Sequence, residues 1–317
     1  MIEFRRFARQ FNFTVSPWLA FFAGAAILTS LLCPPARAQS KFIITWGGNT
    51  PEWNQKLHVN AIRIGCSDQP PSCMRAVQTI ANEQHVDKIF LALRLSSSIA
   101  NEGREYSALS KSTPSLYSVG FDDFLGQMQK LDEPGQEISG MLTAFIDGLK
   151  SENQNLRFGV TLYEDQLTAP LLTSAAMATV RNRTDFVHLF VHYRIDGPDF
   201  ASYVSQAKAI FPNAQIIAGS YPVDRIDYLP CRKNSHIPCT GSQEISLFEK
   251  NFDVQLKLLQ DGAVAGIEFY PGDFGEISKA GLWRDPRSCR PGRLPQCIAT
   301  SQEMEKYVGE KLGHSSL

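Results

Sequence analysis

The feature that most constrains the fold is a repeated alternation of strand-length apolar runs with helix-length amphipathic segments, from residue 42 to residue 312. The apolar runs predict eight strands, over Phe42–Gly47, Asn60–Gly65, Lys88–Leu95, Tyr117–Asp122, Arg157–Tyr163, Phe186–His192, Gln215–Tyr221 and Gly266–Tyr270. The amphipathic segments predict helices over Ser72–Glu83, Gln136–Glu152, Leu171–Asn182, Asp199–Phe211, Ile245–Gln260 and Gln302–Leu312. This alternation is typical of βαβ units, in which helices connect parallel strands.

Eight parallel strands joined by helices predict a (β/α)8 barrel of the TIM type, an α/β fold that usually takes roughly 250 residues. We expect a single barrel domain over residues 39–317, because no linker-like stretch divides the chain. The rival architecture, an open doubly wound sheet, needs a Gly-x-Gly-x-x-Gly turn after a strand, and the sequence has none. The strand at 60–65 follows the first after only a short segment, and without it the count would be seven.

Three segments that follow predicted strands are too long for simple turns. They are Ser96–Ser115, Val223–Gln243 and Gly272–Thr300. In a barrel, the loops after the strands build the mouth at the C-terminal face. We therefore expect these long loops to frame a site there.

The first 38 residues have the features of a cleavable secretory signal peptide. Basic residues precede an apolar run over 18–32, and the segment ends in Ala36-Arg37-Ala38, the small-x-small pattern that signal peptidases cut. A membrane anchor would need an apolar run of roughly 20 residues, and a lipoprotein signal at Cys33 would need a small residue where Leu32 stands. We expect cleavage before Gln39, a secreted or periplasmic protein, and no stable membrane insertion after cleavage.

The cysteines lie as near neighbours in the sequence. Of the seven, Cys33 would leave with the signal peptide. The others form three close pairs: Cys66 with Cys73, Cys231 with Cys239, and Cys289 with Cys297. In an exported protein this pattern predicts three local disulfides. A zinc site would need thiolates at tighter spacing with histidine partners.

Charge and motifs exclude several function classes. The chain carries a formal net charge of −1 and has no run of Lys and Arg, so we expect no nucleic-acid partner. It also lacks a phosphate-cradling loop, a His-Glu-x-x-His helix and a Gly-x-Ser-x-Gly elbow. We expect no cofactor.

Alternation along each strand indicates which side chains face the barrel lumen. In Tyr117–Asp122, the apolar side chains of Val119 and Phe121 face the surrounding helices. Asp122 alternates with them and therefore faces the barrel axis. The same argument turns Glu268, Arg63, Arg94, Thr161 and His188 inward, and other acids follow directly after strand ends. Because barrel enzymes keep their chemistry near the C-terminal ends of strands, the catalytic candidates are Asp122, Glu268, Asp123 and Glu164.

Two acids at a mouth lined with aromatic residues are what glycoside hydrolysis uses. One protonates the leaving oxygen, and the other attacks or activates water. The side chains expected to bind and position substrate are Arg94, Tyr163, His192, Tyr221, Tyr270 and Trp46. A glycan or oligosaccharide is the partner that this set predicts.

A competing interpretation makes the acids structural. Asp122 would then pair with Arg94, and Glu268 with Arg63 or an aromatic hydroxyl, in a polar lumen network without turnover. Metal chemistry is not expected either, because His188 and His192 lie about 13 Å apart on one strand, too far to chelate one ion.

Three segments resemble exported bacterial glycoside-hydrolase-like barrels of unassigned activity. They are Tyr-Ser-Val-Gly-Phe-Asp-Asp-Phe at 117–124, Arg-Phe-Gly-Val-Thr-Leu-Tyr-Glu-Asp-Gln-Leu at 157–167 and Gly-Ile-Glu-Phe-Tyr-Pro-Gly at 266–272. The resemblance implies that the Asp-Asp-Phe strand end and the later strand ending in Tyr and an acid flank the mouth. No predicted strand ends in the Asn-Glu pair of the large retaining-glycosidase clan.

We expect an exported carbohydrate-active barrel that hydrolyses glycosides with two carboxylates. The alternatives are a carbohydrate-binding protein without turnover and a structural envelope protein with a glycosidase-like barrel.

Overall fold

The computed structural model describes residues 41–47, 51–131, 133–222, 241–270 and 294–314. The expected signal peptide at 1–38 lies outside these residues, as do most of the segments 223–243 and 272–300. Within the described part of the chain, no helix combines the length and apolarity that crossing a membrane requires.

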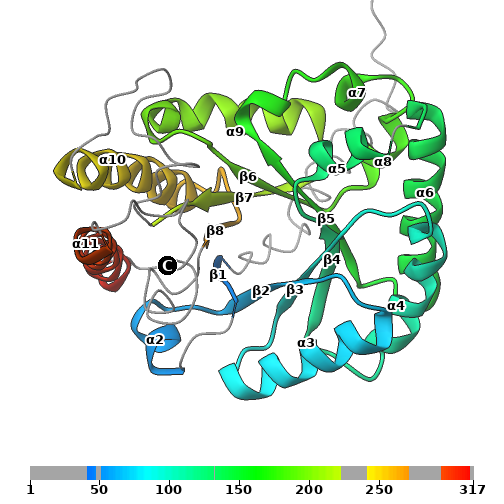
Figure 1. Cartoon of the computed structure of the whole chain (residues 1–317), viewed down its shortest axis with the longest axis horizontal. Coiled ribbons are helices and arrows are strands. Elements are labelled where there is room, and N and C mark those ends of the chain that lie inside the picture. Colours follow the sequence, from blue (N-terminus) through cyan, green and yellow to red (C-terminus); the bar gives the residue numbers. More distant parts are fainter. Residues whose placement is uncertain (1–40, 48–50, 132, 223–240, 271–293, 315–317) are drawn as a thin grey trace, which may run out of the picture. The chain divides into compact units, whose positions relative to one another are not determined.

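Eight parallel strands close into a barrel, which confirms the predicted fold (Figure 1). The strands are β1 Phe42–Trp46, β2 Ala61–Cys66, β3 Ile89–Leu93, β4 Leu116–Phe121, β5 Arg157–Tyr163, β6 Phe186–Phe190, β7 Gln215–Ser220 and β8 Gly266–Phe269. Each strand pairs with the next along the chain, and β8 pairs with β1, with Ile44 opposite Glu268. The strand at 60–65 is therefore present, as β2, and the count is eight.

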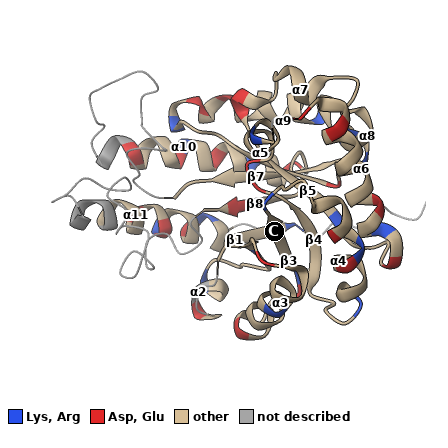
Figure 2. Cartoon of the chain, turned by 45° about the vertical axis from the view of Figure 1, so that its right-hand side comes forward, with Lys and Arg blue, Asp and Glu red and all other residues tan. Residues whose placement is uncertain are grey.

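Helices cover the outside of the strands (Figure 1). They are α2 Pro51–Lys56, α3 Pro70–Gln84, α4 Glu102–Ser110, α5 Phe124–Lys130, α6 Gly135–Glu152, α7 Pro170–Thr173, α8 Ala178–Arg183, α9 Phe200–Ile210, α10 Gly241–Gln260 and α11 Leu294–Gly313. Short 3₁₀ turns η1 Ile99–Asn101, η2 Glu164–Gln166 and η3 Arg194–Asp199 follow β3, β5 and β6. Residues of both charge signs lie along covering helices such as α6 and α10 (Figure 2).

The structure corrects several sequence expectations about the helices. Helices α2 and α5 were not expected, and α11 begins at Leu294, inside the segment 272–300 that was expected to be a loop. The segment 96–115, expected to be a mouth loop, contains η1 and α4. The buried face of α4 consists of Gly103, Tyr106, Ser107 and Ser110, whose helical spacing is masked by their low hydropathy. The helix expected over 171–182 is divided into α7 and α8, because Ser174 adopts an extended backbone with ψ 155°.

The lower part of the barrel lumen is filled with aromatic rings. Phe42, Phe90 and Phe186 pack mutually edge to face, with ring centroids 5.4 to 6.0 Å apart. Phe90 also packs against His188 one layer higher, at 5.5 Å between ring centroids. The apolar packing therefore ends where the polar lumen residues begin, and the lumen is a packed core rather than a pore.

One of the predicted disulfides lies in the described residues. Cys66 at the end of β2 is bonded to Cys73 in α3, as the spacing predicts. Each of the other two predicted pairs, Cys231 with Cys239 and Cys289 with Cys297, includes a cysteine outside the described residues. The Cys66–Cys73 bond ties a barrel strand to its covering helix beside the mouth.

Candidate functional site

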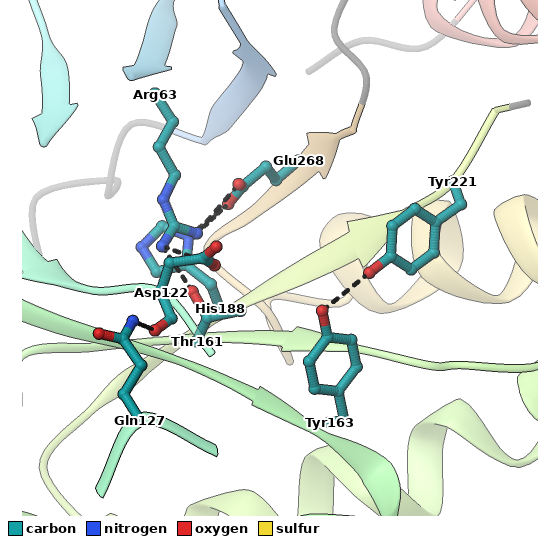
Figure 3. Close-up of polar contacts among 8 residues, drawn as sticks. All are labelled: Arg63, Asp122, Gln127, Thr161, Tyr163, His188, Tyr221 and Glu268. Atoms are coloured by element: carbon teal, nitrogen blue, oxygen red, sulfur yellow. Dashed lines mark hydrogen bonds and ion pairs between the residues drawn. The ribbon is translucent and has the colours of Figure 1, made fainter. Parts of the chain in front are cut away.

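A buried polar layer crosses the lumen above the aromatic rings (Figure 3). The guanidinium of Arg63 on β2 donates from Nη1 to both oxygens of Glu268 on β8, at 3.0 and 3.3 Å. Its Nη2 donates to the hydroxyl of Thr161 on β5. His188 on β6 hydrogen-bonds through Nδ1 to Glu268 Oε2. The exposed fractions of Glu268, His188 and Arg63 are 0%, 2% and 3%, so the layer is closed to solvent.

The electrostatics of the layer keep Glu268 ionised. Burial alone would raise the pKa of Glu268, but the charge of Arg63 and the contacts with His188 outweigh burial and hold that pKa below its usual range. Burial lowers the pKa of His188, and the positive charge of Arg63 lowers it further. The layer therefore consists of a carboxylate, a guanidinium and a neutral imidazole, whose charges and hydrogen-bonding groups are paired with one another.

This geometry bears directly on the role predicted for Glu268. Its oxygens are occupied by Arg63 and His188, and no part of its surface reaches solvent. A glycosidase acid must reach the scissile bond. The pairing of Glu268 with Arg63 is the one expected if this acid is structural, and its catalytic role stays a prediction that the burial does not favour.

Arg63 also links the layer to the mouth of the barrel. Its Nη2 lies 3.8 Å from Oδ1 of Asp122, whose side chain is 46% exposed. The guanidinium also lies over the ring of Trp46, at 4.4 Å. Asp122 therefore pairs with Arg63 and not, as one interpretation of the sequence expected, with Arg94, which lies beyond the end of β3 and is exposed.

The backbone after β4 is strained and held in place at Asp122 and Asp123. Asp123 adopts the left-handed conformation, φ 42° and ψ 50°, which is costly for a residue other than glycine. Gln127 on α5 donates to the carbonyl oxygen of Asp122 and accepts from the N–H of Leu95, so it joins the ends of β3 and β4. The Asp123 carboxylate rests on Gly126, where an added Cβ would lie 2.6 Å from both oxygens.

The surroundings of Asp123 raise the pKa of its carboxyl group. Burial raises its pKa, Lys130 opposes that rise, and the negative charge of Asp122 adds to it. A carboxyl group with a raised pKa beside an ion-paired carboxylate is the arrangement that separates acid and base roles in glycosidases. Sequence reasoning included both aspartates but did not identify Gln127, because a glutamine in an amphipathic helix carries no signal of its own.

A cavity of about 670 Å³ opens beside these acids. It is lined by residues at the ends of β1 to β4 and on α5, among them Trp46, Arg94, Asp122, Asp123, Gln127 and Lys130. This volume lies within the range of small-molecule sites. The cavity therefore contains two of the predicted acids and two of the predicted substrate-binding residues.

The four remaining predicted binding residues continue from Trp46 as an aromatic arc around the mouth, defined here as Trp46, Tyr270, Tyr221, Tyr163 and His192. Trp46 and Tyr270 meet edge to face at 5.4 Å, and Tyr270 and Tyr221 at 6.0 Å. The hydroxyls of Tyr221 and Tyr163 are 3.2 Å apart (Figure 3). His192 stacks on Tyr163 at 3.9 Å between ring centroids. The structure thus brings together all five residues from four strand ends and the segment after β6.

Glu164, the fourth predicted acid, lies at the outer end of this arc. It is buried, and its Oε2 accepts the backbone N–H of His192 at 2.9 Å. Burial raises the pKa of Glu164. Nδ1 of His192 lies 3.6 Å from Glu164 Oε2 and 3.5 Å from Oδ1 of the exposed Asp165. Neighbouring ends of β5 and β6 bring these three residues together.

Comparison with known proteins reveals similarity in fold but not in sequence. No family model and no curated protein sequence matches this chain. Among solved structures, a β-glucuronidase from Bacteroides uniformis is similar with a TM-score of 0.50 and 14% identity, over 74% of this chain and 30% of that one. An exo-β-1,4-mannosidase from Opitutaceae bacterium strain TAV5 is similar with a TM-score of 0.51 and 8% identity, over 84% and 60%.

These comparisons define a class. The chain is a (β/α)8 barrel with structural similarity to glycoside hydrolases at low sequence identity. It spans less than two thirds of the length of either enzyme. At such identities the likeness concerns the fold alone, and activity must be argued from the site.

Replacing Glu268 by Gln tests the buried layer. The substitution keeps the shape but removes the closer and fully buried of the two carboxylates that pair with Arg63, so the free energy of unfolding should fall by about 3–5 kcal/mol. Urea denaturation measures this change. As a control, Asp261→Asn removes one partner of the exposed pair with Lys257 and should change stability by no more than about 0.5 kcal/mol. Equal small effects of both substitutions would show that the layer contributes little.

The depressed pKa of His188 makes stability depend on pH. Below about pH 6.5 the unfolded chain binds a proton at this histidine that the folded chain excludes, so the free energy of unfolding falls as the pH is lowered. The contribution of Glu268, whose folded pKa is depressed, is lost only at lower pH, beneath its ordinary value of 4.5.

Urea denaturation between pH 7 and pH 5 measures the His188 part, with His188→Asn as the reference. Asparagine retains a hydrogen-bond donor toward Glu268 but does not titrate. The parent chain should lose more stability than the variant over this range. Parallel pH profiles for the two proteins would contradict the neutral buried imidazole.

Proposed function

We propose that this protein is an exported carbohydrate-active barrel that hydrolyses a glycosidic bond at the cavity lined by Asp122 and Asp123. The observation that carries the proposal is the placement of these two carboxyl groups in one open cavity with Trp46, at the C-terminal ends of the barrel strands. That face is where barrel enzymes carry their chemistry. Structural similarity to glycoside hydrolases supports the choice of substrate class.

The two aspartates have different surroundings, which suggests different roles. Asp123, with its raised pKa, would hold a proton at higher pH than an ordinary aspartate and donate it to the leaving oxygen as the glycosidic bond breaks. Asp122, ion-paired with Arg63, would stabilise the positive charge that develops at the anomeric carbon. Water then supplies the new hydroxyl at that carbon and returns a proton to the enzyme.

The other residues of the mouth would hold the sugar. Sugar rings stack on aromatic faces through their C–H surface, and the aromatic arc offers such faces from Trp46 round to Tyr163. Arg94 and Lys130, which also line the cavity, would supply donors for sugar hydroxyls. Glu268 would act indirectly, by fixing the guanidinium that faces Asp122.

Substituting each cavity acid by its amide tests this function. Asp122→Asn and Asp123→Asn should each lower glycoside turnover by about 10²–10⁴-fold, because each removes a group that acts on the reacting atoms. The measurement is release of reducing ends from a panel of oligosaccharides and aryl glycosides. The melting temperature should stay close to that of the parent, because Asp122 is half exposed and Asp123 lines the cavity.

The matched control is Asp261→Asn, an exposed aspartate on the surface of the barrel, which should leave turnover unchanged. Sugar binding without any release of reducing ends, by the parent and the variants alike, would instead identify a carbohydrate-binding protein. Loss of stability in both cavity variants with no glycan bound or cleaved would assign the acids to a structural network.

Export is the second part of the proposal. The sequence of residues 1–38 supports it, and so does the Cys66–Cys73 disulfide, because disulfides persist in oxidising compartments. Expressed from its full sequence in a bacterial host, the protein should be recovered from the periplasm or the medium with Gln39 as its first residue, as read by mass spectrometry of the intact chain. Recovery from the cytoplasm or the membrane with residues 1–38 retained would contradict export.

A further inference from the structure

Glu164, Asp165 and His192 form a cluster whose spacing resembles a ligand shell. Their nearest potential ligand atoms all lie within 4.8 Å of one another, and no other such group of three occurs among the residues that the structure describes. His192 Nδ1 is 3.6 Å from Glu164 Oε2 and 3.5 Å from Asp165 Oδ1. Atoms bound tetrahedrally to one ion at about 2.1 Å are separated by about 3.4 Å.

A simple ion pair explains these distances less well. Charge-assisted hydrogen bonds between an imidazolium and a carboxylate are about 2.7–2.9 Å long. Both contacts of His192 Nδ1 exceed that range by more than half an ångström. The nitrogen stands about equally far from two carboxylates and bonds closely to neither, which is the arrangement that a shared ion between them requires.

A second observation comes from Glu164 itself. Its side chain is only 4% exposed, yet its Oε1 atom has no hydrogen-bond partner among the described residues. A buried carboxylate oxygen without a partner is costly, because it has lost water and gained nothing in return. A cation bound by both oxygens of this carboxylate would satisfy Oε1 as well as Oε2.

We propose that Glu164, Asp165 and His192 bind one divalent transition-metal ion at the mouth of the barrel. One imidazole nitrogen with carboxylate oxygens is a ligand set that suits Zn²⁺ or Mn²⁺. The two carboxylates supply the opposite charge, and the third ligand is neutral. Three protein ligands leave a position for water or a sugar hydroxyl.

The ligands are held in position before any ion arrives. The backbone N–H of His192 fixes Glu164 Oε2, and stacking on Tyr163 fixes the plane of the imidazole ring. Asp165 is 59% exposed and His192 33%, so the ion has a path from solvent. Such supporting contacts orient ligands in metal sites generally.

This site goes beyond the proposed glycan hydrolysis and was not expected from the sequence. In the sequence His188 and His192 lie too far apart on one strand to share an ion, whereas the cluster joins the ends of two neighbouring strands. Because His192 belongs to the aromatic arc and stacks on Tyr163, an ion here would lie at the same mouth. Metal binding needs no glycan, so its failure and the failure of the hydrolase proposal are distinguishable.

Calorimetric titration of the full mature protein with Zn²⁺, and electron paramagnetic resonance with Mn²⁺, tests the proposal after stripping with a chelator. We expect one ion per chain for at least one of the two metals. Glu164→Gln, Asp165→Asn and His192→Gln should each weaken binding by about 10–100-fold or more. Asp165→Asn is the most informative of the three, because an exposed side chain can be changed without loss of the fold, as circular dichroism would check.

The matched control is His314→Gln, which removes an exposed imidazole at the end of α11 and should leave the affinity unchanged. The proposal is overturned if neither metal binds stoichiometrically. It is also overturned if the three variants bind as tightly as the parent, or if His314→Gln weakens binding as much as they do.

Discussion

The rest of the structure depends on the ion pair between Arg63 and Glu268 inside the barrel. Two charges buried to this extent are stable only if each is neutralised and hydrogen-bonded. Glu268 is satisfied by Arg63 and His188, and the guanidinium also donates to Thr161. The pair closes the top of the aromatic core and forms the floor of the mouth. The same guanidinium also faces Asp122 and Trp46. The buried ion pair therefore also positions a proposed catalytic acid and a proposed sugar-binding ring.

The mouth above this floor has two sides with different chemistry. The cavity at the ends of β1 to β4 contains Asp122 and Asp123, and its backbone is strained at Asp123 and held by Gln127. The aromatic arc runs from Trp46 at the end of β1 along the ends of β8, β7 and β5 to His192, beside the carboxylates of Glu164 and Asp165. Strain at a strand end, a raised pKa and an aromatic wall in one place are typical of a functional site rather than of packing alone.

Much of this arrangement could be predicted from the sequence, for physical reasons. Apolar runs of strand length separated by helical patterns imply the barrel, and strand alternation correctly turns Arg63, Thr161, His188 and Glu268 inward. Depth along the axis could not be predicted. Glu268 precedes Tyr270 by two residues on the same face of the strand. Those two residues are enough to place Glu268 in the closed polar layer and Tyr270 at the open mouth. The partner of Asp122 was mispredicted because the alternation of side chains along a strand does not show whether Arg63 or Arg94 lies closer to Asp122. Helix α4 was missed because its buried face consists of small and polar residues.

A crystal structure of the Asp123→Asn variant soaked with an oligosaccharide that the parent cleaves or binds would test the central claim most directly. The account predicts a sugar ring in the cavity, against Trp46, with its glycosidic oxygen within hydrogen-bonding distance of residue 123 and its anomeric carbon next to Asp122. Glu268 should remain beneath it, bound to Arg63 and out of contact with the sugar. A sugar bound elsewhere on the barrel, or one that displaces Arg63 and contacts Glu268, would contradict the account.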